Sequence, residues 1–256
     1  MPEVVSWRAA SPGVWIVTMD RPPANALGVP ILDGLHAALD AAEQSGDVKV
    51  MIIASALDGF FAAGADILHL STIDAESFLA YGNQMRAVND RLAGAGWISV
   101  AAVDGLALGG GLELAMACTL RVSGPRAAFG LPEVKLGLIP GAGGTQRLPR
   151  LVGRGRAFDI MLTARQVPAA EALAIGLVDR LTDDDVVKEA LALAADLVTS
   201  SLPAQLAVIR AVDTSYALPL DEGLQAEADE EQGLFEHGEA TEGIQAFLAK
   251  RPPNFS

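Results

Sequence analysis

Two glutamates and a run of glycines are the residues of this sequence whose types and spacing could do chemistry. Three consecutive glycines at 109–111 precede Glu113 inside an apolar run, and Glu133 follows further along the chain. A helix that begins at the glycines leaves backbone N–H groups without partners, and these stabilise an oxygen that carries negative charge. If Glu113 is buried among its apolar neighbours, its pKa should rise, as a general acid or base requires.

Short strands and helices are predicted to position these residues. Residues 100–103 form an apolar run before Asp104-Gly105, which favours a buried strand followed by a turn. Residues 127–130 favour a second short strand, and PGAGGT at 140–145 favours a loop that opens a helix. The two glutamates are too far apart for one helix, so they could meet only across the fold.

Periodicity predicts alternating strands and helices before a helical last third. Residues 1–200 are predicted to form an α/β core and residues 201–256 a helical region, with no flexible hinge at the boundary. The further predicted strands are 4–9, 14–19, 50–54 and 176–179, and the predicted helices are 30–44, a segment with Phe78, Met85 and Leu92 at seven-residue spacing, 156–162, 169–175 and 186–197.

Composition narrows the class of protein. The 256 residues contain 18 Lys and Arg against 32 Asp and Glu, a formal net charge of −14, which argues against binding to nucleic acid or to an anionic membrane surface. The single Cys118 rules out an internal disulfide and suits a reducing compartment. Since the first residues lack the features of a signal or transit peptide, a cytoplasmic location is expected. The apolar run 98–118 contains Asp104 and Glu113, which makes a membrane span improbable.

Several familiar chemistries are not indicated. The glycine run does not complete a dinucleotide fingerprint because Leu114 stands where a third glycine is required, and no G-K-[ST] follows any glycine-rich loop. The three histidines lack metal-ligand spacing, and no G-x-S-x-G elbow is present. The sequence therefore predicts neither a metal nor a nucleotide cofactor.

Three separated motifs resemble the enoyl-CoA hydratase/isomerase family, also called the crotonase family. They are FFAAGADI at 60–67, ALGGGLELAMAC at 107–118 and FGLPEVKLGLIPGAGGTQRLPRLVG at 129–153, and the match extends from RPPANAL at 21–27 to AFLAKRPPNF at 246–255. The resemblance implies an α/β fold, a crotonase-like spiral of repeated ββα units with a C-terminal helical trimerisation region. It also implies a homotrimer or a dimer of trimers.

The resemblance also implies the site. Glu113 and Glu133 match the catalytic glutamates of the hydratases, and the backbone N–H groups of Ala65 and Gly110 match the oxyanion hole. The residues expected to bind an acyl-CoA substrate are Asn25, Ala26, Ala63, Ala65, Asp66, Ile67, Leu68, Gly109, Gly110, Phe235 and Lys250. Asp66 as an ordinary N-cap, Phe235 as a core residue and Lys250 as a solvated one are the alternatives.

The implied reaction is reversible hydration of a 2-trans-enoyl-CoA to a 3-hydroxyacyl-CoA. Glu113 would activate the water and Glu133 would donate the proton, although these two roles could be exchanged. No cofactor is implied, because coenzyme A is part of the substrate. The alternatives are an enoyl-CoA isomerase, hydrolysis or decarboxylation of another acyl-CoA, and a non-catalytic RNA-binding or scaffold protein. The acidic balance and the intact glutamate pair count against the last of these.

Four positions depart from the usual family pattern. Ser99 stands where proline is common, Asp104 where asparagine precedes the glycine, and Thr119 where aspartate follows the cysteine. Leu68 replaces a frequent lysine, which removes an expected contact to a phosphate of the coenzyme.

Overall fold

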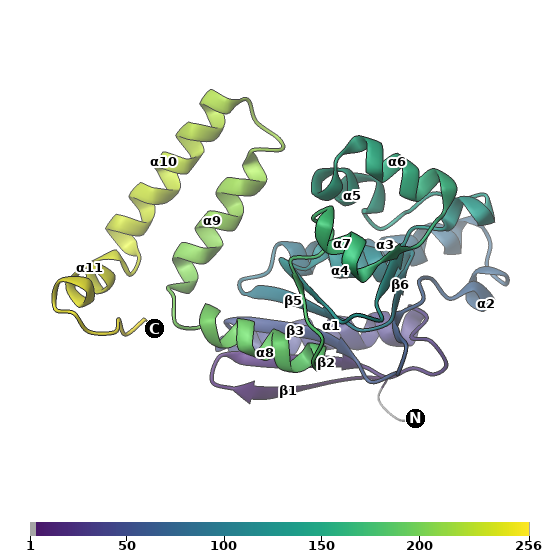
Figure 1. Cartoon of the computed structure of the whole chain (residues 1–256), viewed down its shortest axis with the longest axis horizontal. Helices are drawn as coiled ribbons and strands as arrows, with labels where there is room; N and C mark the ends of the chain where they lie inside the picture. Colours follow the sequence, from purple (N-terminus) through teal and green to yellow (C-terminus); the bar gives the residue numbers. More distant parts are fainter. Residues whose placement is uncertain (1–3, 256) are drawn as a thin grey trace. The chain divides into compact units, whose positions relative to one another are not determined.

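The computed structural model describes residues 4–255, which divide into two compact units (Figure 1). The first unit is Met1–Ala192 and the second is Leu193–Ser256. The division falls inside helix α8 (Val186–Leu197), and the domain boundary near residue 200 stays a prediction.

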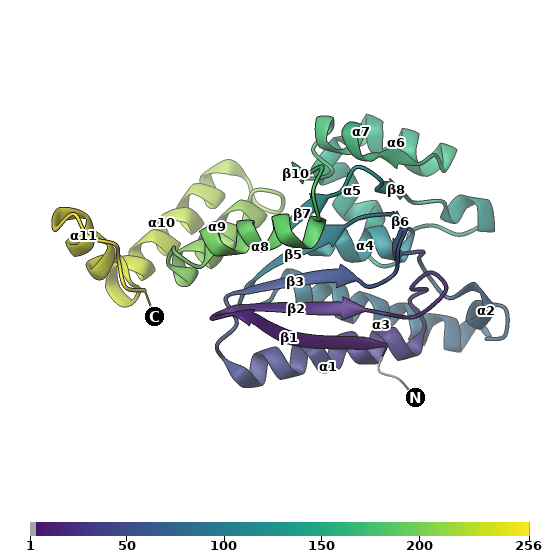
Figure 2. The same cartoon turned by 60° about the horizontal axis from the view of Figure 1, so that its bottom comes forward.

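The larger sheet of the first unit has the strand order β1-β2-β3-β5-β7-β10. The hairpin β1–β2 is antiparallel and every other pair in this sheet is parallel, as the strands lying side by side in Figure 2 show. All residues of β5 and all but the last of β3 are buried, as expected for parallel strands covered on both faces. The strands are β1 (Val5–Ser11), β2 (Val14–Met19), β3 (Val50–Ser55), β5 (Ile98–Val103), β7 (Leu120–Ser123) and β10 (Arg180–Leu181).

A second, four-stranded sheet leads the chain into the motif segments. Its order is β4-β6-β8-β9, with β4, β6 and β8 parallel and β9 antiparallel to β8. Because the carboxyl ends of parallel strands meet at one edge of a sheet, the residues that follow β4, β6 and β8 are brought together there. The bounds are β4 (Phe60–Ala62), β6 (Leu106–Leu108), β8 (Ala128–Gly130) and β9 (Val167–Pro168).

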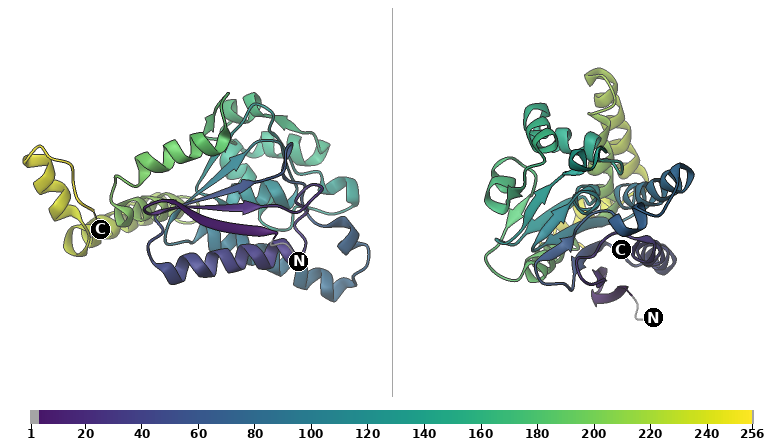
Figure 3. Two further views of the ribbon diagram at one scale, coloured as in Figure 1. Left: turned by 90° about the horizontal axis from the view of Figure 1, so that it is seen from below. Right: turned by 90° about the vertical axis from the view of Figure 1, so that its right-hand side faces the viewer.

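Helices of the first unit cover these sheets. Helices α1 and α3 pack side by side, and α1 also contacts β1 and β2 (Figure 3). Helix α4 is buried over its whole length and contacts both α3 and α5. The helices are α1 (Val29–Ser45), α2 (Ile67–Leu70), α3 (Ala75–Ala93), α4 (Gly110–Ala117), the 3-10 helix η1 (Glu133–Leu136), α5 (Gly144–Val152), α6 (Arg154–Thr163) and α7 (Ala169–Ala174).

The second unit is helical, with α9 (Leu202–Thr214), α10 (Leu220–His237) and α11 (Ala240–Leu248). Helices α9 and α10 pack against each other, and Arg210 of α9 forms an ion pair with Glu230 of α10 at 2.6 Å. A trimer or a dimer of trimers stays a prediction. Within residues 4–255, no single helix is long and apolar enough to cross a membrane; α8 and α9 meet those criteria only together, as a bent pair.

The predicted strand at residues 176–179 is wrong. The N–H groups of Leu177 and Val178 both donate to the carbonyl oxygen of Ala172, at 2.8 and 3.2 Å, so this segment closes the end of α7. Gly176 turns the chain there with φ +79°, and strand β10 begins only after the turn. Apolar residues after a glycine predicted a strand, whereas they complete a helix C-terminus.

Two of the unusual residues bind each other. The Thr119 N–H donates to the Ser99 hydroxyl at 2.9 Å, and the Ser99 N–H faces the Thr119 hydroxyl at 3.3 Å. These hydrogen bonds join β5 to the turn before β7. They explain why a threonine can stand at position 119, which the sequence alone did not explain. Asp104, the third departure, forms an ion pair with Arg126 at 2.6 Å.

Candidate active site

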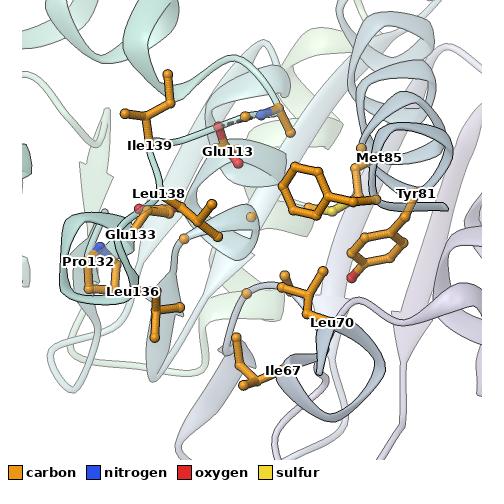
Figure 4. Close-up of a pocket in the computed structure, with 18 of the residues that line it drawn as sticks. Ile67, Leu70, Tyr81, Met85, Glu113, Pro132, Glu133, Leu136, Leu138 and Ile139 are labelled. Carbon is orange, nitrogen blue, oxygen red and sulfur yellow. Dashed lines mark hydrogen bonds between the residues drawn. The ribbon is translucent and has the colours of Figure 1, made fainter. Parts of the chain in front are cut away.

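A cavity of about 130 Å³ lies at the edge where β4, β6 and β8 end (Figure 4). The side chains of its wall are mostly apolar and come from α2, α3 and the segment after η1: Ile67, Leu70, Phe78, Met85, Leu138 and Ile139. The polar side chains that reach it are those of Glu113, Glu133 and Tyr81. An apolar molecule with a few polar atoms at one end fits such a wall.

Glu113 lies in the first turn of α4 and only 1% of it is exposed. Its Oε1 accepts hydrogen bonds from the N–H groups of Ala142, at 2.7 Å, and Gly144, at 2.8 Å. Gly144 begins α5, so the carboxylate faces the positive end of that helix. Burial raises the pKa of Glu113, and the two N–H bonds and the positive charges of Arg147 and Arg86 oppose that rise.

Glu133 begins η1 and differs from Glu113 in its surroundings. Its Oε2 is buried and has no hydrogen-bond partner within residues 4–255. Its Oε1 lies 3.0 Å from the place where a Cβ at Gly109 would stand, so glycine permits the close approach. Gly109 also has a φ of +51°, which favours glycine. Burial first, and then the negative charge of Glu113, raise the pKa of Glu133 to about 7.

Two backbone N–H groups complete the site. The Gly64 carbonyl accepts from the Leu27 N–H at 2.7 Å, and a trans peptide directs its N–H the opposite way, so the Ala65 N–H faces the cavity. The Gly109 carbonyl accepts from the Glu113 N–H at 3.0 Å, which likewise leaves the N–H of Gly110 pointing out of the helix. Neither N–H has a partner in the described part of the chain.

These two donors lie close to each other, because a Cβ at Gly110 would lie 3.8 Å from the Ala65 nitrogen. Two such N–H groups can hold an oxygen on which negative charge develops. Two N–H bonds oppose the effect of burial at Glu113, whereas Glu133 has a pKa of about 7, so the two carboxyl groups differ in how readily they hold a proton. Such a pair can move protons beside a carbonyl group.

Residues 9–256 match the family described as enoyl-CoA hydratase/isomerase. The chain belongs to this family. It is 41% identical over 247 residues to a probable enoyl-CoA hydratase of Rhizobium meliloti, with 94% of each chain covered. It is 39% identical over 248 residues to one of Bacillus subtilis, covering 94% of this chain and 95% of the relative.

The crystal structure of an enoyl-CoA hydratase from Bacillus anthracis superposes with a TM-score of 0.94, at 32% identity and with 98% of each chain covered. The crotonase fold predicted from the motifs, with its two mixed sheets and C-terminal helices, is therefore confirmed. The family acts on acyl-CoA substrates, so this chain is a crotonase-family enzyme.

The crotonase fold brings part of the predicted site together. Ala63, Ala65, Ile67, Gly109, Gly110, Glu113 and Glu133 all line the cavity. Asn25, Ala26, Asp66 and Leu68 do not line it. Phe235 and Lys250 belong to the second unit, where both are exposed, and their contact with the coenzyme stays a prediction.

Asp66 and Leu68 border the cavity without entering it. Asp66 is the N-cap of α2, since its carboxylate accepts from the His69 N–H at 3.2 Å. The same side chain forms an ion pair with Arg21 at 2.7 Å, so it fixes the start of the helix that follows Ala65. Leu68 is 82% exposed.

Asn25 has no exposed surface. Its side-chain amide donates to the Ser55 hydroxyl at 2.8 Å and the Phe61 carbonyl at 3.1 Å, and its Oδ1 accepts from the Arg21 N–H at 2.7 Å. The polar atoms of this side chain all bind the protein and fasten the 21–27 loop to β3 and β4. The expected role of Asn25 in substrate binding stays a prediction.

Asn25→Ala should lower the free energy of unfolding by about 2–4 kcal/mol, because it leaves several buried polar groups unpaired. Urea denaturation measures this change. Asn254→Ala, at an exposed position, is the control and should have little effect. An Asn25→Ala enzyme of normal stability and a raised KM would contradict the structural role and support the binding role.

Glu133→Gln should change stability in a pH-dependent way. Between about pH 4.5 and 7 the folded parent binds more protons than the unfolded chain, so its stability falls as the pH rises and Glu133 must ionise. Glutamine removes this loss. At pH 8 the variant should be more stable by about 1–2 kcal/mol, a value reduced for partial solvent screening, and at pH 4 the two proteins should be equal. Urea titrations at both pH values test this prediction. Equal stability of the two proteins at pH 8 would argue that the surroundings of Glu133 do not favour its protonated form.

Some residues that build the site were not predicted. The Tyr81 hydroxyl donates to the Leu27 carbonyl at 2.6 Å and accepts from the Asp66 N–H at 3.1 Å, which fixes the segment that carries Ala65. The N–H groups of Ala142 and Gly144 hold Glu113. The sequence feature that could have indicated them is the glycine-rich loop at 140–145. The sequence predicted that this loop opens a helix but did not predict that its N–H groups bind Glu113.

Proposed function

We propose that this crotonase-family enzyme catalyses the reversible hydration of a 2-trans-enoyl-CoA to a 3-hydroxyacyl-CoA. The observation that carries the proposal is the unequal pair of carboxyl groups in one cavity. Glu113 receives two N–H bonds, which favour its charged form, whereas Glu133 has a buried oxygen with no partner among residues 4–255 and a pKa of about 7. Addition of water needs one group that accepts a proton and another that supplies one.

The steps follow from this arrangement. The thioester oxygen binds the N–H groups of Ala65 and Gly110. Glu113 takes a proton from a water molecule while the oxygen of that water bonds to C3. The electron pair of the C2–C3 double bond moves toward the thioester oxygen, where the two N–H groups stabilise the charge; one such donor contributes about 3–4 kcal/mol. Glu133 then gives its proton to C2, so that one water has been added to the substrate. The proton on Glu113 passes through solvent back to Glu133, which restores both carboxyl groups for the next turnover.

The proposal is supported by relatives named probable enoyl-CoA hydratases and by a wall suited to a hydrocarbon chain. An enoyl-CoA isomerase needs only one carboxyl group that moves a proton between two carbons. Hydration also needs a second carboxyl group, ionised, that takes a proton from the water. The N–H bonds to Glu113 favour the ionised form of that residue, which suits it to this role.

Crotonyl-CoA in the absence of any added cofactor is the direct test. We expect loss of the enoyl thioester absorbance and a product heavier by one water. Conversion of a 3-enoyl-CoA without a change in mass, with crotonyl-CoA left intact, would support the isomerase instead. Hydrolysis to free coenzyme A would contradict both.

The charge of the acyl tail should decide between substrates. Apolar side chains and two carboxyl groups line the cavity, and no Lys or Arg side chain does so among the described residues. We expect kcat/KM for crotonyl-CoA to exceed that for glutaconyl-CoA, whose tail ends in a carboxylate, by about 100-fold, because burying an unpaired charge is costly. Steady-state kinetics with both compounds measure the ratio, and comparable values would contradict the prediction.

A further inference from the structure

One of the peptide groups around the cavity is held by a charged side chain. The carbonyl of Gly141 accepts a hydrogen bond from Nη1 of Arg86 at 2.8 Å. The N–H of the same peptide belongs to Ala142 and donates to Glu113 at 2.7 Å. Since a trans peptide points its C=O and N–H in opposite directions, one planar group connects the guanidinium to the carboxylate.

The other peptides of the site are held differently. The carbonyls of Gly64 and Gly109 accept from the backbone N–H groups of Leu27 and Glu113, so these two peptides are held by backbone bonds rather than by a charged side chain. The Gly141 carbonyl lies in a loop between η1 and α5, outside any helix or strand. Its hydrogen bond to Arg86 is therefore a contact that a single substitution can remove.

Arg86 is itself held in place on α3. Its guanidinium also donates to the Asn83 side chain, one turn earlier. A Cβ at Gly82 would lie 3.4 Å from Nη1, so glycine at this position leaves room for the guanidinium to fold back along the helix. The arginine thus approaches the loop in a defined orientation.

We propose that Arg86 is a positioning residue, which holds the Gly141–Ala142 peptide with its N–H directed at the Glu113 carboxylate. The part of this proposal that concerns the reaction rests on the proposed function, in which Glu113 takes the proton of the water. A charge at the carbonyl end of a peptide also polarises its N–H, which strengthens the hydrogen bond to an anion.

Three charged groups act on Glu113 from the elements around α4: Arg86 of α3, Arg147 of α5 and Glu133 of η1. Arg147 donates to the Ala142 carbonyl at 3.2 Å and is paired with Asp90 at 3.3 Å, so part of its charge is compensated. Arg86 forms no ion pair within residues 4–255. Removal of Arg86 should therefore make Glu113 easier to protonate.

The test compares Arg86→Met and Arg86→Lys with Arg91→Met. Arg91 lies on the same helix and pairs with Asp40 and Glu43 of α1 at 2.6 and 2.9 Å, away from the cavity, so it is a matched control for loss of an arginine from α3. Carbon NMR of side-chain-labelled glutamate follows the ionisation of Glu113, with Glu113→Gln to assign the signal.

We expect Arg86→Met to move the Glu113 midpoint to higher pH, Arg86→Lys to restore it in part, and Arg91→Met to leave it unchanged. At pH 6 the kcat of the Arg86→Met enzyme for hydration should fall by about 10-fold or more, because a misplaced catalytic group slows the chemical step. Its KM should change by a smaller factor. Arg86→Lys, which keeps the charge, is the second variant if Arg86→Met folds poorly.

An unchanged Glu113 midpoint in Arg86→Met, or an equal change in Arg91→Met, would overturn the proposal. A raised KM with unchanged kcat and midpoint would also overturn it, since Arg86 would then act on the substrate. The NMR measurement needs no turnover. If the midpoint moves but the parent does not hydrate crotonyl-CoA, the proposed function fails and the role of Arg86 stands.

Discussion

Glu133→Gln should lower kcat for crotonyl-CoA hydration by about 10²–10⁴-fold and leave substrate affinity nearly unchanged. The buried Oε2 of Glu133 has no partner in the described chain, and burial and the charge of Glu113 raise its pKa to about 7, so a proton is available near neutral pH. Glutamine has almost the same shape but cannot supply that proton to C2. Steady-state absorbance assays give kcat, and binding of the 3-hydroxyacyl-CoA product measured by calorimetry gives the affinity.

The control for this change is Glu76→Gln, at an exposed glutamate in the first turn of α3. It should behave as the parent. In the parent, hydration should slow as the pH rises above about 7 and Glu133 loses its proton, and this decline should disappear in Glu133→Gln. If Glu133→Gln kept most of its hydration rate, Glu133 could not be the donor.

The sequence predicted the segments of the site better than the roles of single polar residues. The glycines at 109–111 and the order of the motifs predicted a helix start beside two carboxyl groups, and the structure has both. Asn25 lies in an equally suggestive motif, yet its side chain binds only the protein. A loop sequence does not indicate which polar side chain pairs with the backbone, because that depends on strands distant in the chain.

Periodicity has a similar limit on α3. Phe78 and Met85 recur at seven-residue spacing, which predicts a face that packs on the core. The same spacing suits a face that lines a cavity, since both are apolar, and these two side chains line the cavity. Tyr81, between them, fixes the Ala65 segment with its hydroxyl, and nothing in the spacing distinguishes it from a core residue.

Glu113→Gln should also lower kcat by about 10²–10⁴-fold, for a different reason. The amide oxygen of glutamine can still accept from the N–H groups of Ala142 and Gly144, so the loop and the fold should be retained. What is lost is the negative charge that takes the proton from water. Circular dichroism and urea denaturation check the fold, and crotonyl-CoA kinetics measure the loss.

The double variant Glu113→Gln/Glu133→Gln distinguishes shared from separate roles. If the two carboxyl groups act on the same water and the same double bond, removing the second adds little once the first is gone, because groups that act as a unit are not additive. We therefore expect the double variant to be about as slow as the slower single variant. Multiplied losses would mean that the two groups serve independent steps, and near-normal hydration by Glu113→Gln alone would remove it as the base. Since Glu113 holds its two N–H bonds in either case, such a result would make it a structural carboxylate that anchors the 140–144 loop.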